Sequence, residues 1–309
     1  MAPARLEATA VIGLGSMGLG IGQSLLRTAM PVTGYDPDAT ALAKFVAGGG
    51  QAASGPAEAA QDMAAVVTVV VNAAQTETVL FGGDGSKGAV ATMRRGGVVL
   101  SSATMSPQDA RRLAERCGSA GVLYLDAPIS GGAGRAASGE LTVMASGSPD
   151  AFARAEPILE AIAKTVYRLG DEPGIGASFK MVNQLLAGVH IAAACEAITF
   201  AKRLGLDIDK VFEVITASAG NSWMFENRIP HVLAGDYRPA SAVDIFAKDL
   251  GIVADIGRAE KFPTPLAANA LQLFLMTSAA GMGRDDDASV ARLIAQVTRL
   301  DLPGTTPRT

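Results

Sequence analysis

The sequence predicts an α/β protein: an N-terminal doubly wound parallel sheet followed by an all-helical C-terminal half. Up to about residue 170, short runs rich in β-branched residues alternate with helical patterns of roughly a dozen residues, which is typical of repeated βαβ units. The strand signals end at the Pro/Gly-rich segment 171–176, and only helical patterns follow. We therefore expect one domain over residues 1–172 and an all-α domain over residues 173–309, joined by a long helix.

Six runs predict the strands of the first domain, and all are expected in the one parallel sheet. Most are almost continuously apolar, as expected for a sheet that helices cover on both faces. In chain order the runs are TAVIGLG (9–15), PVTGYD (31–36), AAVVTVVVN (64–72), GGVVLSS (96–102), GVLYLDAP (121–128) and TVYRLG (165–170).

The second domain begins with a long helical pattern. It runs over residues 177–204, about 42 Å at 1.5 Å per residue, with Gly205 as the expected C-terminal cap. Only the tail, residues 302–309, is expected to be disordered.

Composition excludes several classes of partner. The 309 residues are 49% hydrophobic with a net charge of −4, so the chain can bury a large core and has no basic excess for nucleic acid. His190 and Glu196 interrupt the longest apolar stretch, and the N-terminus lacks a signal-peptide pattern, so no membrane partner is expected. Cys117 and Cys195 are expected in the core, and we predict a cytoplasmic protein.

The strongest local motif is VIGLGSMG, in which Gly13, Gly15 and Gly18 form G-x-G-x-x-G between a strand and a helix. Such a loop places a pyrophosphate on the N-terminus of the helix, so we predict a Rossmann-type dinucleotide site that also includes Leu14, Ser16 and Met17. A plain glycine turn is the alternative interpretation.

Asp36 ends the second strand, and this position predicts hydrogen bonds to the adenosine ribose. Its carboxylate would repel the 2′-phosphate of NADP, and no Arg or Lys follows until Lys44. The sequence therefore favours NAD as the cofactor.

The segment DAPISGGAGRAASGELTVMASG follows the strand at 121–128, where open α/β sheets form ligand crevices. Ser130, Gly131 and Gly132 offer a hydroxyl and successive backbone N–H groups, a combination that binds anions. We predict that they hold the carboxylate of a small substrate. A flexible glycine-rich hairpin is the alternative.

Lys180 lies near the start of the long helix, and Asn183 follows at i+3 on the same face. The apolar residues around Lys180 leave little polar face to solvate, so we expect both side chains in a crevice between the domains. No cluster has metal-ligand spacing, so no metal is expected. His190 and His231 are expected to be structural, and Trp223 with Phe225 either belong to the core or cover the crevice.

Four segments together resemble the β-hydroxyacid dehydrogenases, which include 3-hydroxyisobutyrate, tartronate-semialdehyde-type and 6-phosphogluconate-like enzymes. The segments are GLGSMG, DAPISGGAGRAASGELTVMASG, GASFKMVNQ and FAKDLG, and the resemblance covers residues 8 to about 298. It implies an NAD-dependent hydroxyacid dehydrogenase that forms a homodimer or homotetramer.

The resemblance also implies roles for individual residues. Lys180 matches the catalytic lysine, which either accepts the hydroxyl proton or acts as a fixed cation with water as the base. Asn183 matches the residue that orients the substrate, and Ser130, Gly131 and Gly132 match the loop for its carboxylate. The positions that match cofactor contacts are Val71, Asn72, Thr104 and Lys248. Ser101 stands where the family often has Asp.

The substrate prediction is narrower. VNQLLAGVHIAAACEAI and AGNSWMFENR resemble most the members that act on the four-carbon sugar acid L-threonate, and Asn183, Gln184, Asn221 and Ser222 could bind its extra hydroxyls. The alternative functions are a 3-hydroxyisobutyrate dehydrogenase or a semialdehyde-type reductase of the same family, an NADPH-dependent imine reductase, and a dinucleotide-binding module without catalysis.

Overall fold

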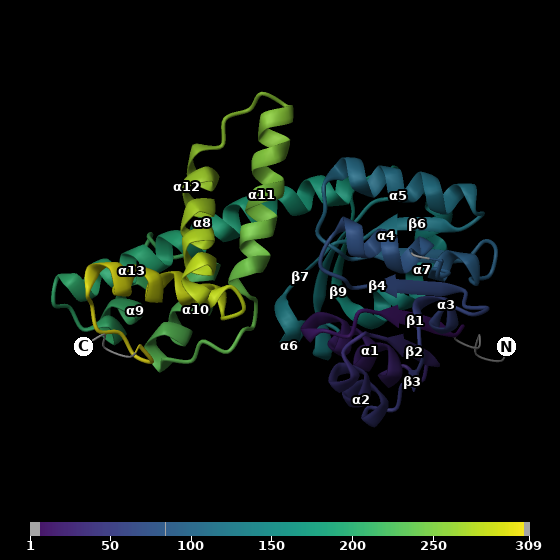
Figure 1. Cartoon of the computed structure of the whole chain (residues 1–309), viewed down its shortest axis with the longest axis horizontal. Helices are drawn as coiled ribbons and strands as arrows, with labels where there is room; N and C mark the ends of the chain where they lie inside the picture. The colour runs from purple at the N-terminus through teal and green to yellow at the C-terminus, as the bar shows by residue number, and fades with distance from the viewer. Residues whose placement is uncertain (1–6, 84, 306–309) are drawn as a thin grey trace. The chain divides into compact units, whose positions relative to one another are not determined.

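The computed structural model describes residues 7–83 and 85–305 (Figure 1). The chain divides into two compact units, Met1–Lys180 and Met181–Thr309, referred to below as unit 1 and unit 2. The division falls within one continuous helix, α8 (Ile175–Arg203), so this helix belongs to both units.

Unit 1 contains a six-stranded parallel sheet with the order β3-β2-β1-β4-β5-β6. This is the strand order of doubly wound dinucleotide-binding domains, and it confirms the predicted fold class. The strands are β1 (Thr9–Ile12), β2 (Val32–Tyr35), β3 (Gln51–Ala52), β4 (Ala65–Thr68), β5 (Val98–Ser101) and β6 (Leu123–Asp126).

Helices cover both faces of this sheet (Figure 1). Alternate residues of β1 point to opposite sides, so Val11 joins one core cluster while Ala10 and Ile12 join the other. The helices packed on the Val11 side are α1 (Ser16–Arg27), α2 (Ala39–Ala47), α6 (Gly132–Ser138) and α7 (Pro149–Ile162). Those on the other side are α3 (Pro56–Ala59), α4 (Ala73–Phe81), η1 (Ala89–Ala91) and α5 (Pro107–Ser119).

A second, three-stranded sheet follows β6, with the order β7-β8-β9. Its strands are β7 (Ile129–Ser130), β8 (Leu141–Ala145) and β9 (Ala163–Arg168). The prediction that run 165–170 joins the parallel sheet is therefore wrong. The end of β6 is joined to the second sheet by an isolated antiparallel bridge between Asp126 and Ser146. In the second sheet β8 pairs antiparallel with β7 and parallel with β9, so run 165–170 pairs with β8 and not with β6.

Helix α8 closely matches the predicted long helix. Beyond its end, Gly205 adopts a left-handed φ of +76°, its N–H donates to the Lys202 carbonyl, and Leu206 N–H donates to the Ala201 carbonyl. These two bonds are those of a Schellman cap, so the predicted stop at Gly205 is confirmed. Among the described residues α8 is long and apolar enough to span a membrane, but a buried core helix meets the same criteria and 56% of its apolar window is buried.

Among its described residues, unit 2 consists of helices joined by turns and loops, with one isolated bridge between Ala242 and Asp286. Its core gathers apolar side chains from α8 and all later helices, and it includes Cys195 and Leu302. Leu302 contradicts the prediction of a disordered tail at that position, while residues 306–309 lie outside the described range. The elements are α9 (Ile208–Thr216), α10 (Trp223–Ala234), α11 (Val243–Ala259), α12 (Pro265–Thr277), η2 (Ser278–Met282), η3 (Asp287–Ser289) and α13 (Val290–Thr298).

Candidate active site

The predicted phosphate loop has the geometry that its glycines require. A Cβ on Gly18 would lie 1.8 Å from the Gly13 carbonyl oxygen, and one on Gly13 would lie 2.6 Å from the Val69 oxygen. Gly15, by contrast, has no neighbouring atom within 4 Å of an added Cβ. The loop is thus tight against its own backbone and open where a pyrophosphate would approach the N-terminus of α1, whose first turn carries no acidic residue.

Asp36 connects this loop to the end of β2. Its Oδ2 accepts a hydrogen bond from Leu14 N at 2.6 Å, and its Oδ1 accepts one from Asp38 N at 2.8 Å. Each carboxylate oxygen keeps a further lone pair for a ribose hydroxyl. The glycine loop at the N-terminus of α1 and the Asp36 carboxylate together fit a dinucleotide, which would supply the hydride acceptor.

Three other predicted cofactor residues, Val71, Asn72 and Thr104, follow the carboxyl ends of β4 and β5. Asn72 accepts a hydrogen bond from Gln75 N at 2.9 Å and so caps α4, and Val71 precedes it with an exposed side chain. Thr104 lies half-buried between β5 and α5. The side chains at these strand ends therefore lie at the edge where open sheets bind ligands.

The predicted substrate loop, residues 130–132 (called the substrate loop below), is joined to the predicted phosphate loop through two helices. Ser130 ends β7, Gly131 has a φ of +137°, and Gly132 begins α6. Helix α6 packs directly on α1, because a Cβ on Gly20 would lie 2.7 Å from Ala137 N, and the Ser24 hydroxyl donates to the Ala136 carbonyl at 2.8 Å. The sequence analysis did not identify Gly20 or Ser24, since only the three-dimensional packing reveals their function.

Lys180 lies beside the substrate loop. It is 7% exposed, and its Nζ donates to the Ile129 carbonyl at 2.9 Å, one residue before Ser130. Unit 1 by itself therefore brings together the predicted lysine and the predicted carboxylate loop.

Asp126 is a buried polar residue that was not among the predicted site residues. It ends β6, is 2% exposed, and its Oδ2 accepts hydrogen bonds from Gly174 N at 2.9 Å and Ala177 N at 2.8 Å. Burial raises the pKa of Asp126 to about 6, although these bonds and one from Ser146 act in the opposite direction. The signal in the sequence was an aspartate in the apolar run GVLYLDAP.

In unit 2, four polar side chains form a chain of hydrogen bonds from α8 to α11. Asn183 Nδ2 donates to Gln184 Oε1 at 2.9 Å, Gln184 Nε2 donates to Asp249, and Asp249 pairs with Lys248. Asp249 is 1% exposed. The predicted residues Asn183 and Lys248 are thus linked through Gln184 and Asp249, and the adjacent acid in FAKDLG was the available signal.

Other candidate residues have local partners. Gln184 uses both ends of its amide within this chain of hydrogen bonds, and Ser222 caps α10 by accepting from Phe225 N at 3.0 Å. Asn221 donates to the Thr216 carbonyl at 3.1 Å. Phe225 is buried and stacks on Phe212, so it belongs to the core, whereas Trp223 is half exposed.

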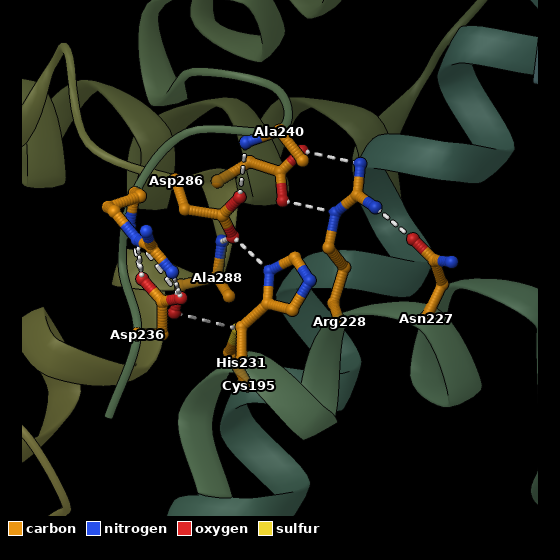
Figure 2. Close-up of polar contacts among 10 residues, drawn as sticks. Cys195, Asn227, Arg228, His231, Asp236, Ala240, Asp286 and Ala288 are labelled. Atoms are coloured by element: carbon orange, nitrogen blue, oxygen red, sulfur yellow. Dashed lines mark hydrogen bonds and ion pairs between the residues drawn. The ribbon is translucent and has the colours of Figure 1, made fainter. Parts of the chain in front are cut away.

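Figure 2 shows a second polar cluster of unit 2. Arg228 forms two hydrogen bonds with Asp287 at 2.6 and 3.1 Å, and His231, one helical turn later, lies 3.0 Å from Asp286. Asp286 also accepts from Ala240 N and Ala288 N. The sequence analysis found no partner for His231, and the structure supplies one. Among the described residues no group of His, Cys, Asp or Glu could hold a metal ion.

Comparison with known proteins gives two matching families. Residues 8–170 match the NAD binding domain of 6-phosphogluconate dehydrogenase, and residues 174–294 match the family described as NAD-binding of NADP-dependent 3-hydroxyisobutyrate dehydrogenase.

Individual relatives match over nearly the whole chain. The L-threonate dehydrogenase of Cupriavidus necator is 53% identical over 294 residues, covering 95% of this chain and 97% of that one. The L-threonate dehydrogenase of Escherichia coli (strain K12) is 47% identical, covering 95% and 96%. A crystal structure named 3-hydroxyisobutyrate dehydrogenase from Salmonella typhimurium has a TM-score of 0.88 and 48% identity, covering 93% of this chain and 99% of that one.

Proposed function

The chain belongs to the 3-hydroxyisobutyrate dehydrogenase-like family of β-hydroxyacid dehydrogenases, and from this premise we propose that it oxidises L-threonate at carbon 2 to 2-dehydro-L-erythronate. It is an NAD-dependent dehydrogenase of a small hydroxyacid. The observation that supports the proposal is the contact between Lys180 and the residue before Ser130, which places a buried lysine next to the loop predicted to bind the substrate carboxylate. The names of the relatives support the four-carbon sugar acid.

The residues divide the work as follows. Ser130, Gly131 and Gly132 hold the substrate carboxylate, and Asn183 orients the carbon 2 hydroxyl. Lys180 either accepts the hydroxyl proton or stabilises the forming oxyanion while water takes the proton. NAD supplies the hydride acceptor when bound. The phosphate loop, Asp36, Val71, Asn72, Thr104 and Lys248 bind the cofactor.

The test is a 340 nm absorbance assay with purified enzyme, NAD and a panel of hydroxyacids. We expect kcat/KM for L-threonate to exceed that for 3-hydroxyisobutyrate by at least about tenfold. Lys180→Ala should lower kcat by roughly 10²- to 10⁴-fold while NAD binding persists, and Lys164→Ala, on the exposed strand β9, is the control. Equal turnover of 3-hydroxyisobutyrate and L-threonate would contradict the proposal that L-threonate is the substrate. A fully active Lys180→Ala variant would contradict the catalytic role of Lys180.

Cofactor choice is tested in the same assay. We expect kcat/KM to be at least about tenfold higher with NAD than with NADP, because the Asp36 carboxylate repels a 2′-phosphate. Asp36→Asn keeps an oxygen for Leu14 N, gives up the acceptor for Asp38 N and removes the charge, so it should narrow this difference while the phosphate loop keeps its hydrogen bond. Equal efficiency of the wild type with both cofactors would refute the proposal.

We also propose a homodimer or homotetramer in the cytoplasm. Unit 2 exposes large apolar side chains on several helices and in the turn that follows α8, which supports association with further copies. They are Phe200, Leu204, Leu206, Leu266 and Val297. The buried free thiols of Cys117 and Cys195 are consistent with a reducing compartment. Sedimentation as a monomer at micromolar concentration would contradict the oligomer.

A further inference from the structure

We propose that Asp126, together with Ser146, is a positioning residue for Lys180. Both fix the first turn of α8 on the end of the sheet, and this turn determines where the lysine side chain lies beside the substrate loop. The inference rests on the proposed catalytic role of Lys180 and adds a residue to which neither the sequence nor the family comparison gives a role.

Backbone N–H groups at the start of a helix have no partner within that helix. At α8 the preceding residue is Gly174, which has no side chain to cap them. Asp126 Oδ2 accepts from Gly174 N and Ala177 N, and Ser146 Oγ accepts from Gly176 N at 2.9 Å. Two residues that follow or end strands elsewhere in the chain therefore cap this helix.

The two capping residues are themselves fixed to each other. Asp126 N donates to the Ser146 carbonyl at 3.0 Å, Ser146 N donates to the Asp126 carbonyl at 2.8 Å, and the Ser146 hydroxyl donates to Asp126 Oδ2 at 3.3 Å. A Cβ on Gly176 would lie 2.3 Å from the Met144 oxygen and 3.0 Å from the Asp126 oxygen. The first turn of α8 thus contacts the backbone of the strands directly, and this close contact leaves no space for the turn to shift toward the sheet.

The same two chain segments meet again at the lysine. Ile129 follows Asp126 by three residues and accepts the Lys180 ammonium, while Lys180 follows Ala177 by three residues on the helix. Three residues span only about 4.5 Å along the helix axis, so Lys180 lies less than one turn from the capped residue Ala177. A shift of the capped turn should therefore move the Lys180 ammonium by about the same distance as the turn itself. Displacements of ~1 Å at a reacting group can cost ~100-fold in rate.

Helix α7 shows what an ordinary cap in the same unit looks like. Its cap is Ser148, the residue directly before the helix, which accepts one bond from Ala151 N at 3.2 Å. This local cap stabilises α7 but fixes it to nothing else. Ser148→Ala is therefore the matched control for the loss of a helix cap without displacement of a catalytic side chain.

The experiment compares Asp126→Ala, Asp126→Asn and Ser148→Ala by kcat, KM and thermal melting. Asp126→Ala should lower kcat by about 10- to 100-fold while KM for NAD changes less than about twofold. Asp126→Asn keeps an acceptor oxygen and should restore kcat to within about threefold of wild type. Ser148→Ala should lower the melting temperature and leave kcat unchanged.

A folded Asp126→Ala enzyme with wild-type kcat overturns the proposal, as does an Asp126→Asn enzyme as slow as Asp126→Ala. If Asp126→Ala does not fold, Ser146→Ala gives the decision, because it removes the bond from Gly176 N and the long bond to Asp126 Oδ2 but keeps the Asp126 carboxylate, and it should lower kcat without affecting NAD binding.

Lys180→Ala in the same assay separates the two proposals. If it is inactive while Asp126→Ala turns over normally, only the positioning role is wrong. If Lys180→Ala is fully active, the catalytic role itself is wrong. A readout without catalysis is labelling of Lys180 by an amine reagent, followed by mass spectrometry. Labelling should be faster in Asp126→Ala than in wild type, and an unchanged rate counts against a shift of the lysine.

Discussion

Asp126 of unit 1 and Asp287 of unit 2 are both almost inaccessible to water, but their carboxylates have different partners. Asp126 accepts from two backbone N–H groups and the Ser146 hydroxyl, whereas Asp287 is paired with the Arg228 guanidinium. Burial raises the pKa of each to about 6. The difference teaches that unit 1 holds a helix with neutral donors beside its predicted lysine, while unit 2 connects α10 to η3 by opposite charges.

The largest effect on stability is expected from removing the Arg228 guanidinium, the cation that pairs with Asp287. Arg228→Met leaves Asp287 buried without its partner and should lower the free energy of unfolding by about 3–5 kcal/mol, measured by urea titration. Arg258→Met is the control, because the Arg258–Asp255 pair is exposed and its loss should cost less than about 1 kcal/mol. The double variant Arg228→Met with Asp287→Asn should recover part of the loss, and no recovery would mean that the buried charge is not the cause.

An intermediate effect is expected from Asp126, in the dependence of stability on pH. Its folded pKa lies above the ordinary value of 3.8, so between 3.8 and about 6 the folded chain binds more protons than the unfolded chain. Stability from this group is therefore present below pH 3.8 and lost as the pH rises to about 6. Wild type should lose about 3 kcal/mol relative to Asp126→Asn over this range.

Denaturant unfolding of both proteins across the range measures this difference. A stability difference that does not change with pH would mean that the helix N-terminus and the nearby Arg111 fully offset the burial of the charge.

The smallest effect is expected at His231, which is only partly buried. The hydrogen bond to Asp286 raises its pKa above 6.5, so its contribution is complete below pH 6.5 and disappears as the pH rises through the folded pKa. His231→Gln should lower stability below pH 6.5 by about 1 kcal/mol or less, and by less still at higher pH. In an Asp286→Asn background the same change should have no pH-dependent effect, and a remaining dependence would point to another partner.

The predictable parts of the fold are those that local patterns encode. Apolar runs bounded by turns predicted every strand of the parallel sheet except the short, exposed β3, and G-x-G-x-x-G with Asp36 predicted the cofactor loop whose close contacts the structure displays. The stop of α8 was predictable because a single glycine with positive φ ends a helix.

The parts that could not be predicted depend on pairing between distant segments. The run at 165–170 has strand character, but nothing in it specifies β8 as its neighbour instead of β6. Asp126 lies 51 residues before Ala177, and Gln184 lies 65 residues before Asp249, so neither contact leaves a local signature. The roles of Lys180, Asn183 and the substrate loop stay predictions that the assays above test.

The bond from Leu14 N to Asp36 Oδ2 has a consequence for the design of cofactor specificity. Replacing Asp36 with a small residue to admit NADP would also remove the acceptor that fixes the second residue of the phosphate loop. Any gain in affinity for the 2′-phosphate would then be offset by weaker binding of the pyrophosphate. A designer should therefore keep a neutral acceptor at position 36 and introduce the positive charge nearby, with exposed Asp38 as the position to change.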